Sequence, residues 1–439
     1  MKFRKVVVAH GVENPGDPVF HAFKDQFVKL DENQFVNFWA IYLVSLAHEQ
    51  FIKGKRYSDY LKDAGKEISA FRNACSMAHI PEIKAKKSLK DILQWTLHVL
   101  STWSPKVTYK SPDGLGELQF ELFSREQPTL QTQQIGDSEA LPQYVNNIKD
   151  SLEAVLRKAE LSLWLMIDRL DELFPRRSAL ERLALRGLLH AMSTFSSETI
   201  RVKVFLRDDM LQNVVRGENG FTALTHITAR QADTLRWTED QILTMVVKRI
   251  FANKELVEYL KVDLARLDAS ARYRNEIFYR VFPQKVHKGP KQSATLKWLY
   301  NRCADGRNVV TPRDVIDLLS RAKQRQQDDF RANAAGTSEW LIGPTALQYG
   351  LEQLSMRKRL TYLEAEFPHL WPHIEKFVGG KTEYSEPAMG KALGKNWKSI
   401  SEDLVSVGLF NKTTRKKQPV YLIPFLYRKG LEVTQGRAE

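Results

Sequence analysis

The stretch LSLWLMIDRLDELF, residues 161–174, constrains the possible folds of this chain more than any other. Its first seven residues are apolar, form a run short enough for a strand, and would be apolar on both faces, as the centre of a parallel sheet requires. Asp168, Asp171 and Glu172 then follow within five positions. Open α/β sheets bind ligands at the carboxyl ends of their strands. The stretch therefore predicts a buried strand of an α/β sheet that ends in a group of carboxylates.

Carboxylates that are crowded together repel one another unless a cation lies among them. One interpretation is a magnesium and nucleotide site, in which Asp168 faces the metal and Asp171 or Glu172 orients an attacking water. The other is a buried strand followed by the acidic start of a helix, because the helix dipole favours acids at that end. This stretch alone supports the two interpretations equally.

A second apolar alternation, IRVKVFLR at residues 200–207, predicts another strand. Aliphatic residues stand at every second position from Ile200, and the run ends in a cation, Arg207. An amphipathic helix is predicted between the two strands, at residues 177–192, which gives the strand–helix–strand order of a parallel crossover. We therefore expect Arg207 to lie beside the acids that follow the first strand.

The length of 439 residues allows two or three domains, each with its own core. Lysine and arginine exceed aspartate and glutamate by 66 − 52 = 14, which suggests a polyanionic partner without identifying one. The two cysteines, Cys75 and Cys303, are too few for a disulfide framework and indicate a reducing compartment, so we expect a cytoplasmic protein. The sequence contains no apolar run as long as a membrane span and no signal-peptide pattern at its start.

The phosphate-binding loop of nucleotide-binding folds, G-x-x-x-x-G-K-[ST], is not found in the sequence. The nearest segment, residues 379–382, has Glu375 in place of the first glycine and follows no predicted strand. A strand is predicted at residues 5–10. In nucleotide-binding folds the phosphate-binding loop comes before such a strand. We therefore expect a truncated or misstarted chain whose residues 1–229 form a nucleotide-binding α/β domain without the loop. A hairpin is predicted within this domain at residues 105–123.

Beyond Arg207 the pattern becomes helical. Residues 238–251 open with a Thr-x-x-Gln capping box, Thr238 to Gln241, and carry an apolar face. Further helices predicted at 293–304 and 311–326 complete a helical unit over about 230–327. The polar segment 324–338 is predicted to be a linker.

The last part of the chain, about 343–439, has helices followed by two short strand-like pieces around a basic loop, which predicts a winged helix. Its partner is either DNA or a protein. The basic residues would contact phosphates in the first case and only solvent in the second. His369 and His373, four residues apart, are a weak metal-binding pair because no third ligand accompanies them. The candidate nucleic-acid contacts are Lys391, Lys395 and Lys398 near the recognition helix, and Lys412, Arg415, Lys416 and Lys417 in the wing.

Taken together, these segments resemble a bacterial family of STAND- and NACHT-like P-loop ATPases, some of them tied to defence loci. The stretches that carry the resemblance are VVVAHGVENPGDPVF, WLMIDRLDE, IRVKVFLRDDM, LRWTEDQILTMVVKRI, TPRDVIDLL and YLIPFLYRKGL. In that family a D-x-x-D-E pattern ends the Walker B strand, and an arginine that senses the γ-phosphate ends the next strand. Asp168 to Glu172 and Arg207 are similar to that pair.

The resemblance implies binding and hydrolysis of ATP with Mg²⁺, coupled to a conformational switch, possible oligomerisation and a winged helix that locks against the nucleotide domain. It also implies that the helical unit is a lid, in which Arg313 would contact the phosphates; an exposed arginine at a helix start is the ordinary alternative. Because the chain lacks the phosphate-binding loop, we expect it to hydrolyse ATP poorly. The alternative function is that of a nucleotide-independent DNA-binding module.

Overall fold

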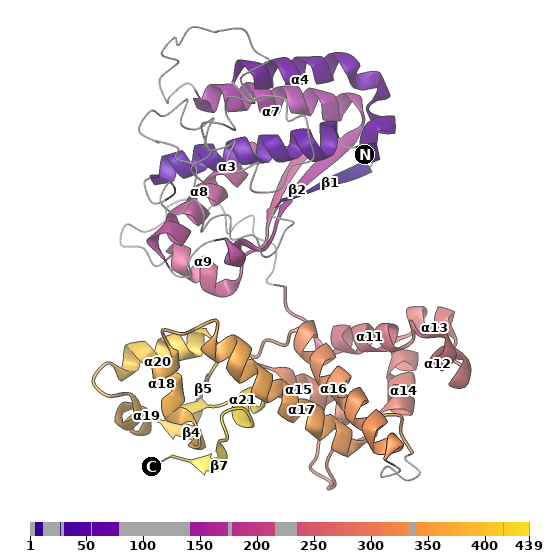
Figure 1. Cartoon of the computed structure of the whole chain (residues 1–439), viewed down its shortest axis with the longest axis vertical. Coiled ribbons are helices and arrows are strands. Elements are labelled where there is room, and N and C mark those ends of the chain that lie inside the picture. The colour runs from indigo at the N-terminus through magenta and orange to yellow at the C-terminus, as the bar shows by residue number, and fades with distance from the viewer. Residues whose placement is uncertain are drawn as a thin grey trace. The chain divides into compact units, whose positions relative to one another are not determined.

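The computed structural model describes residues 5–11, 27, 30–53, 55–78, 141–173, 178–215, 235–332, 339–415 and 417–438. The chain divides into two compact units, residues 1–232 and 233–439, and each is described by itself (Figure 1). The hairpin predicted at residues 105–123 and the basic residue Lys416 lie outside the described residues.

The first unit contains a parallel three-stranded sheet, in the order β1-β2-β3. Lys5 pairs with Leu161, and Leu163 pairs with Ile200, so the strands expected at residues 163–167 and 200–206 are parallel neighbours. This confirms an α/β arrangement for this part of the chain. The strands are β1 (Lys5–Gly11), β2 (Leu161–Ile167) and β3 (Ile200–Val204).

The central strand β2 was expected to be buried on both faces, and this expectation is wrong. Burial alternates along it: every second residue from Leu161 to Ile167 is buried, whereas Trp164 on the other face is 36% exposed. The ammonium group of Lys203 on β3 lies 5.2 Å from the centre of the Trp164 ring. The outer face is therefore covered in part by a cation–π contact rather than by an apolar layer.

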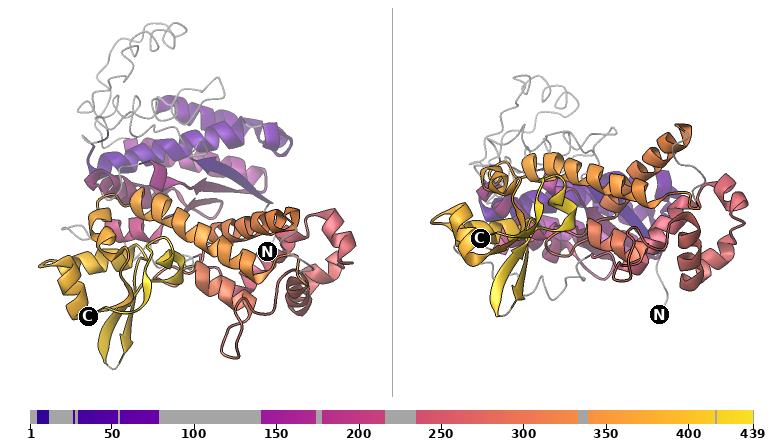
Figure 2. Two further views of the ribbon diagram at one scale, coloured as in Figure 1. Left: turned by 60° about the horizontal axis from the view of Figure 1, so that its bottom comes forward. Right: turned by 90° about the horizontal axis from the view of Figure 1, so that it is seen from below.

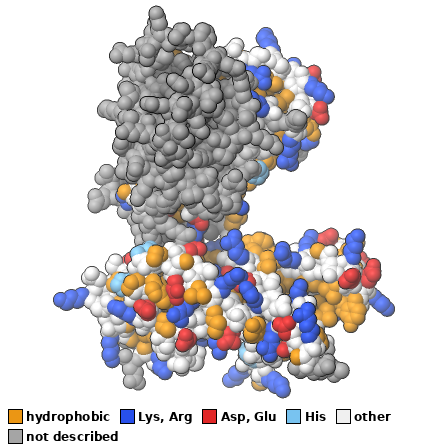
Figure 3. All heavy atoms as spheres, viewed as in Figure 1, with side chains coloured by type: hydrophobic (Ala, Val, Ile, Leu, Met, Phe, Trp, Pro, Cys, Tyr) orange, Lys and Arg blue, Asp and Glu red, His pale blue; other side chains and the backbone are white. Residues whose placement is uncertain are grey.

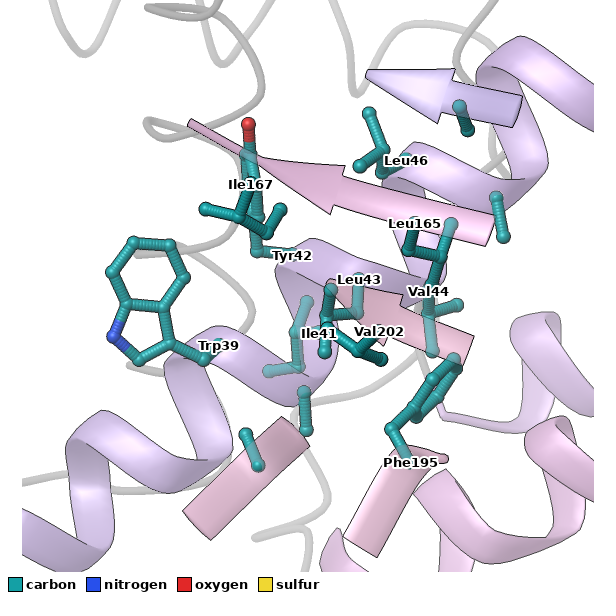
Figure 4. Close-up of a cluster of buried hydrophobic side chains, with 14 of the residues drawn as sticks. Trp39, Ile41, Tyr42, Leu43, Val44, Leu46, Leu165, Ile167, Phe195 and Val202 are labelled. Carbon is teal, nitrogen blue, oxygen red and sulfur yellow. The ribbon is translucent and has the colours of Figure 1, made fainter. Parts of the chain in front are cut away.

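Helix α3 packs the core of the first unit against the sheet (Figure 4). It begins with a capping box formed by Asp31 and Gln34, and nearly all of its residues from Phe35 onward are buried. The indole Nε1 of Trp39 donates a hydrogen bond of 2.8 Å to the carbonyl of Ala184 on the crossover helix α8. The helices are α3 (Glu32–Ala47), α4 (Gly65–Met77), α7 (Leu141–Lys158), α8 (Ala179–Phe195) and α9 (Asp208–Val215).

The second unit contains helices and a mixed four-stranded sheet. The sheet has the order β5-β6-β4-β7, in which β4 and β7 are parallel and the other pairs antiparallel. Its strands are β4 (Lys381–Ser385), β5 (Asn411–Arg415), β6 (Gln418–Leu422) and β7 (Thr434–Arg437). Its first helices are α11 (Glu239–Ile250), α12 (Lys254–Tyr259), α13 (Leu264–Ala269), α14 (Ala271–Val281), α15 (Thr295–Cys303) and α16 (Pro312–Arg331). They are followed by α17 (Pro344–Lys358), α18 (Trp371–Ile374), α19 (Glu386–Leu393), α20 (Trp397–Ser406) and α21 (Phe425–Arg428).

Two predictions for this unit require correction. Helix α16 continues to Arg331, through the first half of the predicted linker, and an Arg325–Asp329 ion pair of 2.8 Å supports this polar extension. The predicted basic loop at 411–418 is mostly strand: β5 and β6 form a tight hairpin in which Lys417 adopts a positive φ of 64°. The hairpin projects from the body of the second unit in both views of Figure 2.

The segments predicted as a helical unit and as a winged helix, 230–327 and 343–439, contribute to one hydrophobic core. The turn after α15 joins them directly: the amide of Gly306 donates to the carbonyl of Gly408 at 2.7 Å, and the side-chain amide of Asn411 donates to the carbonyl of Gly306 at 3.0 Å. A side chain at residue 306 would collide with the backbone of Phe410. The helices and the sheet of this unit are therefore packed as one body.

Candidate functional site

The turn that follows β2 places the predicted acids. Arg169 adopts a left-handed conformation with φ 57° and ψ 31°, and the short 3₁₀ turn Leu170–Glu172 comes next. Leu170 and Leu173 are buried and anchor this turn in the core. Asp168 is exposed at the end of the strand, where its Oδ1 accepts a hydrogen bond of 2.7 Å from the backbone N–H of Arg169. The sharp reversal directly after the strand thus leaves the Asp168 carboxylate facing solvent.

Arg207 meets one of the acids, as the sequence predicted. The amide of Phe205 donates to the carbonyl of Ile167 at 2.9 Å, which holds the end of β3 beside the end of β2. An Nη1 atom of Arg207 lies 3.3 Å from Oδ2 of Asp171, and each side chain is about 30% exposed, with values of 31% and 29%. A cation and a carboxylate that follow two adjacent parallel strands therefore form an open ion pair at the carboxyl edge of the sheet.

The carboxylates at this edge of the sheet could bind magnesium only together with a ligand that supplies further oxygen atoms. Among the described residues, no three histidine, cysteine, aspartate or glutamate side chains are grouped closely enough to hold a metal ion. Mg²⁺ is commonly bound by one or two carboxylates together with waters and substrate phosphates. Asp168 fits such a site, because its second carboxylate oxygen has no hydrogen-bond partner within the described residues.

Two other predicted residues are placed differently. The side chain of Glu172 lies outside what the structure describes. Arg313 is exposed at the second position of α16, in the second unit, and its expected contact with phosphates stays a prediction.

The lysines predicted near a recognition helix lie on and between α19 and α20. Lys391, Lys395 and Lys398 are all exposed. Residues 395–400, with His373, line a shallow depression of about 600 Å³ at the start of α20. The N-cap residue of this helix, Asn396, makes no side-chain capping hydrogen bond. The depression thus combines a helix N-terminus that lacks a side-chain cap with two lysines, which is a favourable environment for an anion.

In the structure, His373 lines the depression at the start of α20. Its Nδ1 atom is buried and has no hydrogen-bond partner in the described part of the chain. Sequence reasoning linked it to His369 through their spacing, but not to the lysines that share its depression. The signal was missed because residues 373 and 395 come together only through the packing of the 368–378 segment on the later helices.

The cations of the hairpin are only partly free. Lys412 and Lys417 are exposed, and the Lys412 ammonium lies 5.6 Å from the centre of the Tyr421 ring. Arg415 forms an ion pair of 2.6 Å with Glu383 on β4. Figure 3 shows basic side chains mixed with acidic ones over the face of the second unit that it draws. The hairpin therefore has less uncompensated charge than its sequence suggests.

The two cysteines do not provide a nucleophile. Burial raises the pKa of the Cys75 thiol to about 12 and that of Cys303 well above its usual range. Both are therefore protonated and inert at neutral pH.

No protein-family model, no curated protein and no solved structure matches this chain. Among the described helices, none combines the length and the apolar character that crossing a bilayer would need.

Proposed function

We propose that the first unit binds a magnesium–nucleoside triphosphate, ATP by resemblance, and hydrolyses its terminal phosphate as part of a molecular switch. The observation that carries this proposal is the Asp171–Arg207 pair at the carboxyl ends of two adjacent parallel strands. Ligands of open α/β sheets bind at that edge. In this proposal the sheet is of the P-loop NTPase type.

Each side chain has a role that its position allows. Asp168 would hold Mg²⁺, and Asp171 or Glu172 would orient the water that attacks the γ-phosphate, releasing ADP and phosphate. Arg207 would exchange its carboxylate partner for the γ-phosphate. This exchange costs little, because an ion pair that is about a third exposed contributes at most about 1 kcal/mol to stability.

The rate of hydrolysis should be low in this chain. Its 439 residues include no G-x-x-x-x-G-K-[ST] segment, the loop whose backbone amides hold the β-phosphate in P-loop enzymes. Phosphoryl transfer is catalysed mainly by positioning and by electrostatic stabilisation. Asp168, Asp171 and Arg207 would therefore act on a phosphate that is only weakly held.

The test is magnesium-dependent ATP hydrolysis by the purified chain and by Arg207→Ala and Asp171→Ala variants. We expect slow turnover that each substitution lowers by at least about tenfold, because each removes a group that faces the reacting phosphate. Arg201→Ala, which removes an exposed cation from the opposite end of β3, is the matched control and should keep the wild-type rate. Turnover that is equal in all four proteins, or no turnover at any magnesium concentration, would refute the proposal.

A second candidate function is supported by the depression at the start of α20. We infer that α19, α20 and the β5–β6 hairpin act as a winged helix that binds the DNA backbone through Lys391, Lys395 and Lys398. These three exposed lysines adjoin a helix N-terminus that lacks a side-chain cap, and backbone amides at helix N-termini bind phosphate.

Duplex DNA titrated at two salt concentrations tests this candidate. Each phosphate that a lysine neutralises contributes about −0.9 to the slope of log K against log salt, so substituting the three lysines by alanine should flatten the slope by up to about 2.7. The charge-matched control replaces three exposed lysines elsewhere in the second unit, Lys254, Lys288 and Lys297. Equal slopes for the two triple variants would exclude this surface as the DNA contact.

A further inference from the structure

Two arginines of the second unit stack on one phenylalanine. The guanidinium carbon of Arg302, at the end of α15, lies 3.3 Å from the centre of the Phe425 ring, and that of Arg428, at the end of α21, lies 3.8 Å from it. Two guanidinium groups at these distances cannot share one face of a ring. They therefore lie on opposite faces, with Phe425 between them.

Neither arginine is compensated by an acid in the described part of the chain. Arg428 donates from Nε to the carbonyl of Ile423 at 2.9 Å and from Nη1 to the side-chain oxygen of Gln435 at 3.0 Å, and both acceptors are neutral. Arg302 makes no hydrogen bond and no ion pair among the described residues; its other aromatic neighbour is Trp298, at 5.8 Å. The two positive charges thus face each other across one ring without a counterion.

The titration of both arginines reflects this arrangement. Burial and, to a smaller extent, the positive charge of Arg428 together lower the pKa of Arg302 to about 10. Burial also lowers the pKa of Arg428 from its usual value. A guanidinium normally stays charged far above pH 10, so this cluster keeps its charge at a free-energy cost in the absence of an anion.

The aromatic ring between the arginines is accessible and has the polarity that an anion needs. Phe425 is 37% exposed, so a ligand can reach its edge from solvent. The faces of a phenyl ring are electronegative and bind cations, whereas its edge carries partial positive charge. An anion at the ring edge would meet the positive edge and both guanidinium groups at once.

We propose that Arg302 and Arg428 form a phosphate-binding site at the edge of Phe425. Guanidinium groups present paired N–H donors that match phosphate oxygens, and two of them balance a phosphate dianion. The phosphate comes from a nucleotide or from a nucleic-acid backbone, which share this chemistry. Phe425 and Arg428 belong to the YLIPFLYRKGL segment, and Arg302 belongs to α15. All three lie in the second unit, whereas the Asp171–Arg207 pair lies in the first, so the site does not depend on the function proposed for that pair.

The competing explanation is purely structural: the arginines would only fasten α15 to α21 through cation–π contacts. The two explanations differ in what the uncharged variants do. If the role is structural, Arg302→Gln should lower the thermal midpoint and leave phosphate binding unchanged. If the site binds phosphate, Arg302→Gln should leave the midpoint unchanged or raise it, because it removes an uncompensated charge, and should abolish binding.

The experiment is calorimetric titration of the full chain with pyrophosphate at low salt, repeated with ATP, a short DNA duplex and citrate. Each titration is repeated with the Arg207→Ala variant, which separates binding at the Asp171–Arg207 pair from binding at Arg302 and Arg428. We expect pyrophosphate binding that Arg302→Gln and Arg428→Gln each weaken by at least about tenfold. Lys429→Ala removes an exposed cation next to Arg428 and should change binding less than about twofold.

The pattern of ligands identifies the source of the phosphate. Binding of ATP without DNA indicates a nucleotide, and binding of DNA as well indicates a backbone phosphate. Arg302→Lys keeps the charge but loses the paired N–H donors of the guanidinium group, so it should give an intermediate affinity. It replaces the glutamine variant in the experiment if that variant does not fold. The proposal is overturned if no phosphate ligand binds, if binding survives in the Arg302→Gln and Arg428→Gln variants, or if citrate binds as tightly as pyrophosphate.

Discussion

Charged side chains of the second unit that are at least partly buried fall into two groups, those that pair with an opposite charge among the described residues and those that do not. Asp314 belongs to the first group: its side chain is 8% exposed and forms an ion pair of 3.1 Å with Lys358 of α17. Arg302 and Arg428 belong to the second group. The Asp314–Lys358 pair holds α16 and α17 together, whereas the role proposed for Arg302 and Arg428 is to bind an anion. Removing a cation should therefore have opposite effects at the two places.

Replacing Lys358 by alanine should destabilise the second unit by about 3–5 kcal/mol, because the Asp314 carboxylate would remain buried without a counterion. Chemical unfolding followed by circular dichroism measures the change. Arg357→Ala is the control: Arg357 pairs with Asp317 at 2.9 Å but is 53% exposed, so its loss should cost less than about 1 kcal/mol. Equal costs for the two neighbours would show that burial of Asp314 does not matter.

The residues of the candidate site were predictable where they follow a strand. Asp168, Asp171 and Arg207 could be found because each comes just after a short apolar run that predicts a strand, and parallel strands bring their ends together. The Arg302–Phe425–Arg428 stack could not be found. Arg302 lies more than a hundred residues before Phe425 and Arg428 in sequence, and no periodicity relates α15 to α21.

At the scale of elements, the close approach of α3 and α8 decides how the first core is packed. Gly187 of α8 faces the backbone of α3: a Cβ there would lie 2.5 Å from the Cβ of Phe35 and 2.8 Å from its carbonyl carbon. Backbone atoms of a hydrogen-bonded helix cannot move aside as a side chain can. The close packing of α3 against α8 therefore requires glycine at position 187.

Replacing Gly187 by alanine should destabilise the first unit by about 1–3 kcal/mol through overpacking, despite the better helix propensity of alanine. The matched control is Gly65→Ala at the start of α4, where a Cβ would meet nothing within 4 Å. That change should be neutral or stabilise by up to about 1 kcal/mol. Urea midpoints compare the two variants, and a loss of stability at both positions would contradict the packing argument.

Some of the elements that the sequence did not predict are polar. Strands β4 and β7, KTEYS and TQGR, show no apolar alternation, and backbone pairing in the mixed sheet stabilises them instead. The polar end of α16 likewise lacks an apolar face but has charge pairs four residues apart. The capping box at Thr238 was predicted correctly, because that signal is local to the sequence.

At the scale of the whole molecule, the two units have separate hydrophobic cores. Each core is large enough to support cooperative unfolding. Binding or substitution in one unit should then act first on the stability of that unit alone.

Differential scanning calorimetry of the whole chain should show two transitions. Gly187→Ala should lower the midpoint of one of them by about 2–12 °C, since about 1 kcal/mol corresponds to roughly 2–4 °C for a unit of this size. Lys358→Ala should lower only the other. A single transition that both substitutions shift equally would mean that the two cores unfold together.

The contact between the Gly306 turn and the segment 408–411 has a consequence for gene rearrangement. A crossover near residue 335 would separate the helices before it from the sheet after it, and so divide one core between two parents. The exchanged halves would each expose apolar surface, and residue 306 of one parent would meet an unmatched backbone at residue 410. Recombination near residue 233 cuts between the cores instead. Functional chimaeras of this protein should therefore inherit residues 233–439 as one block.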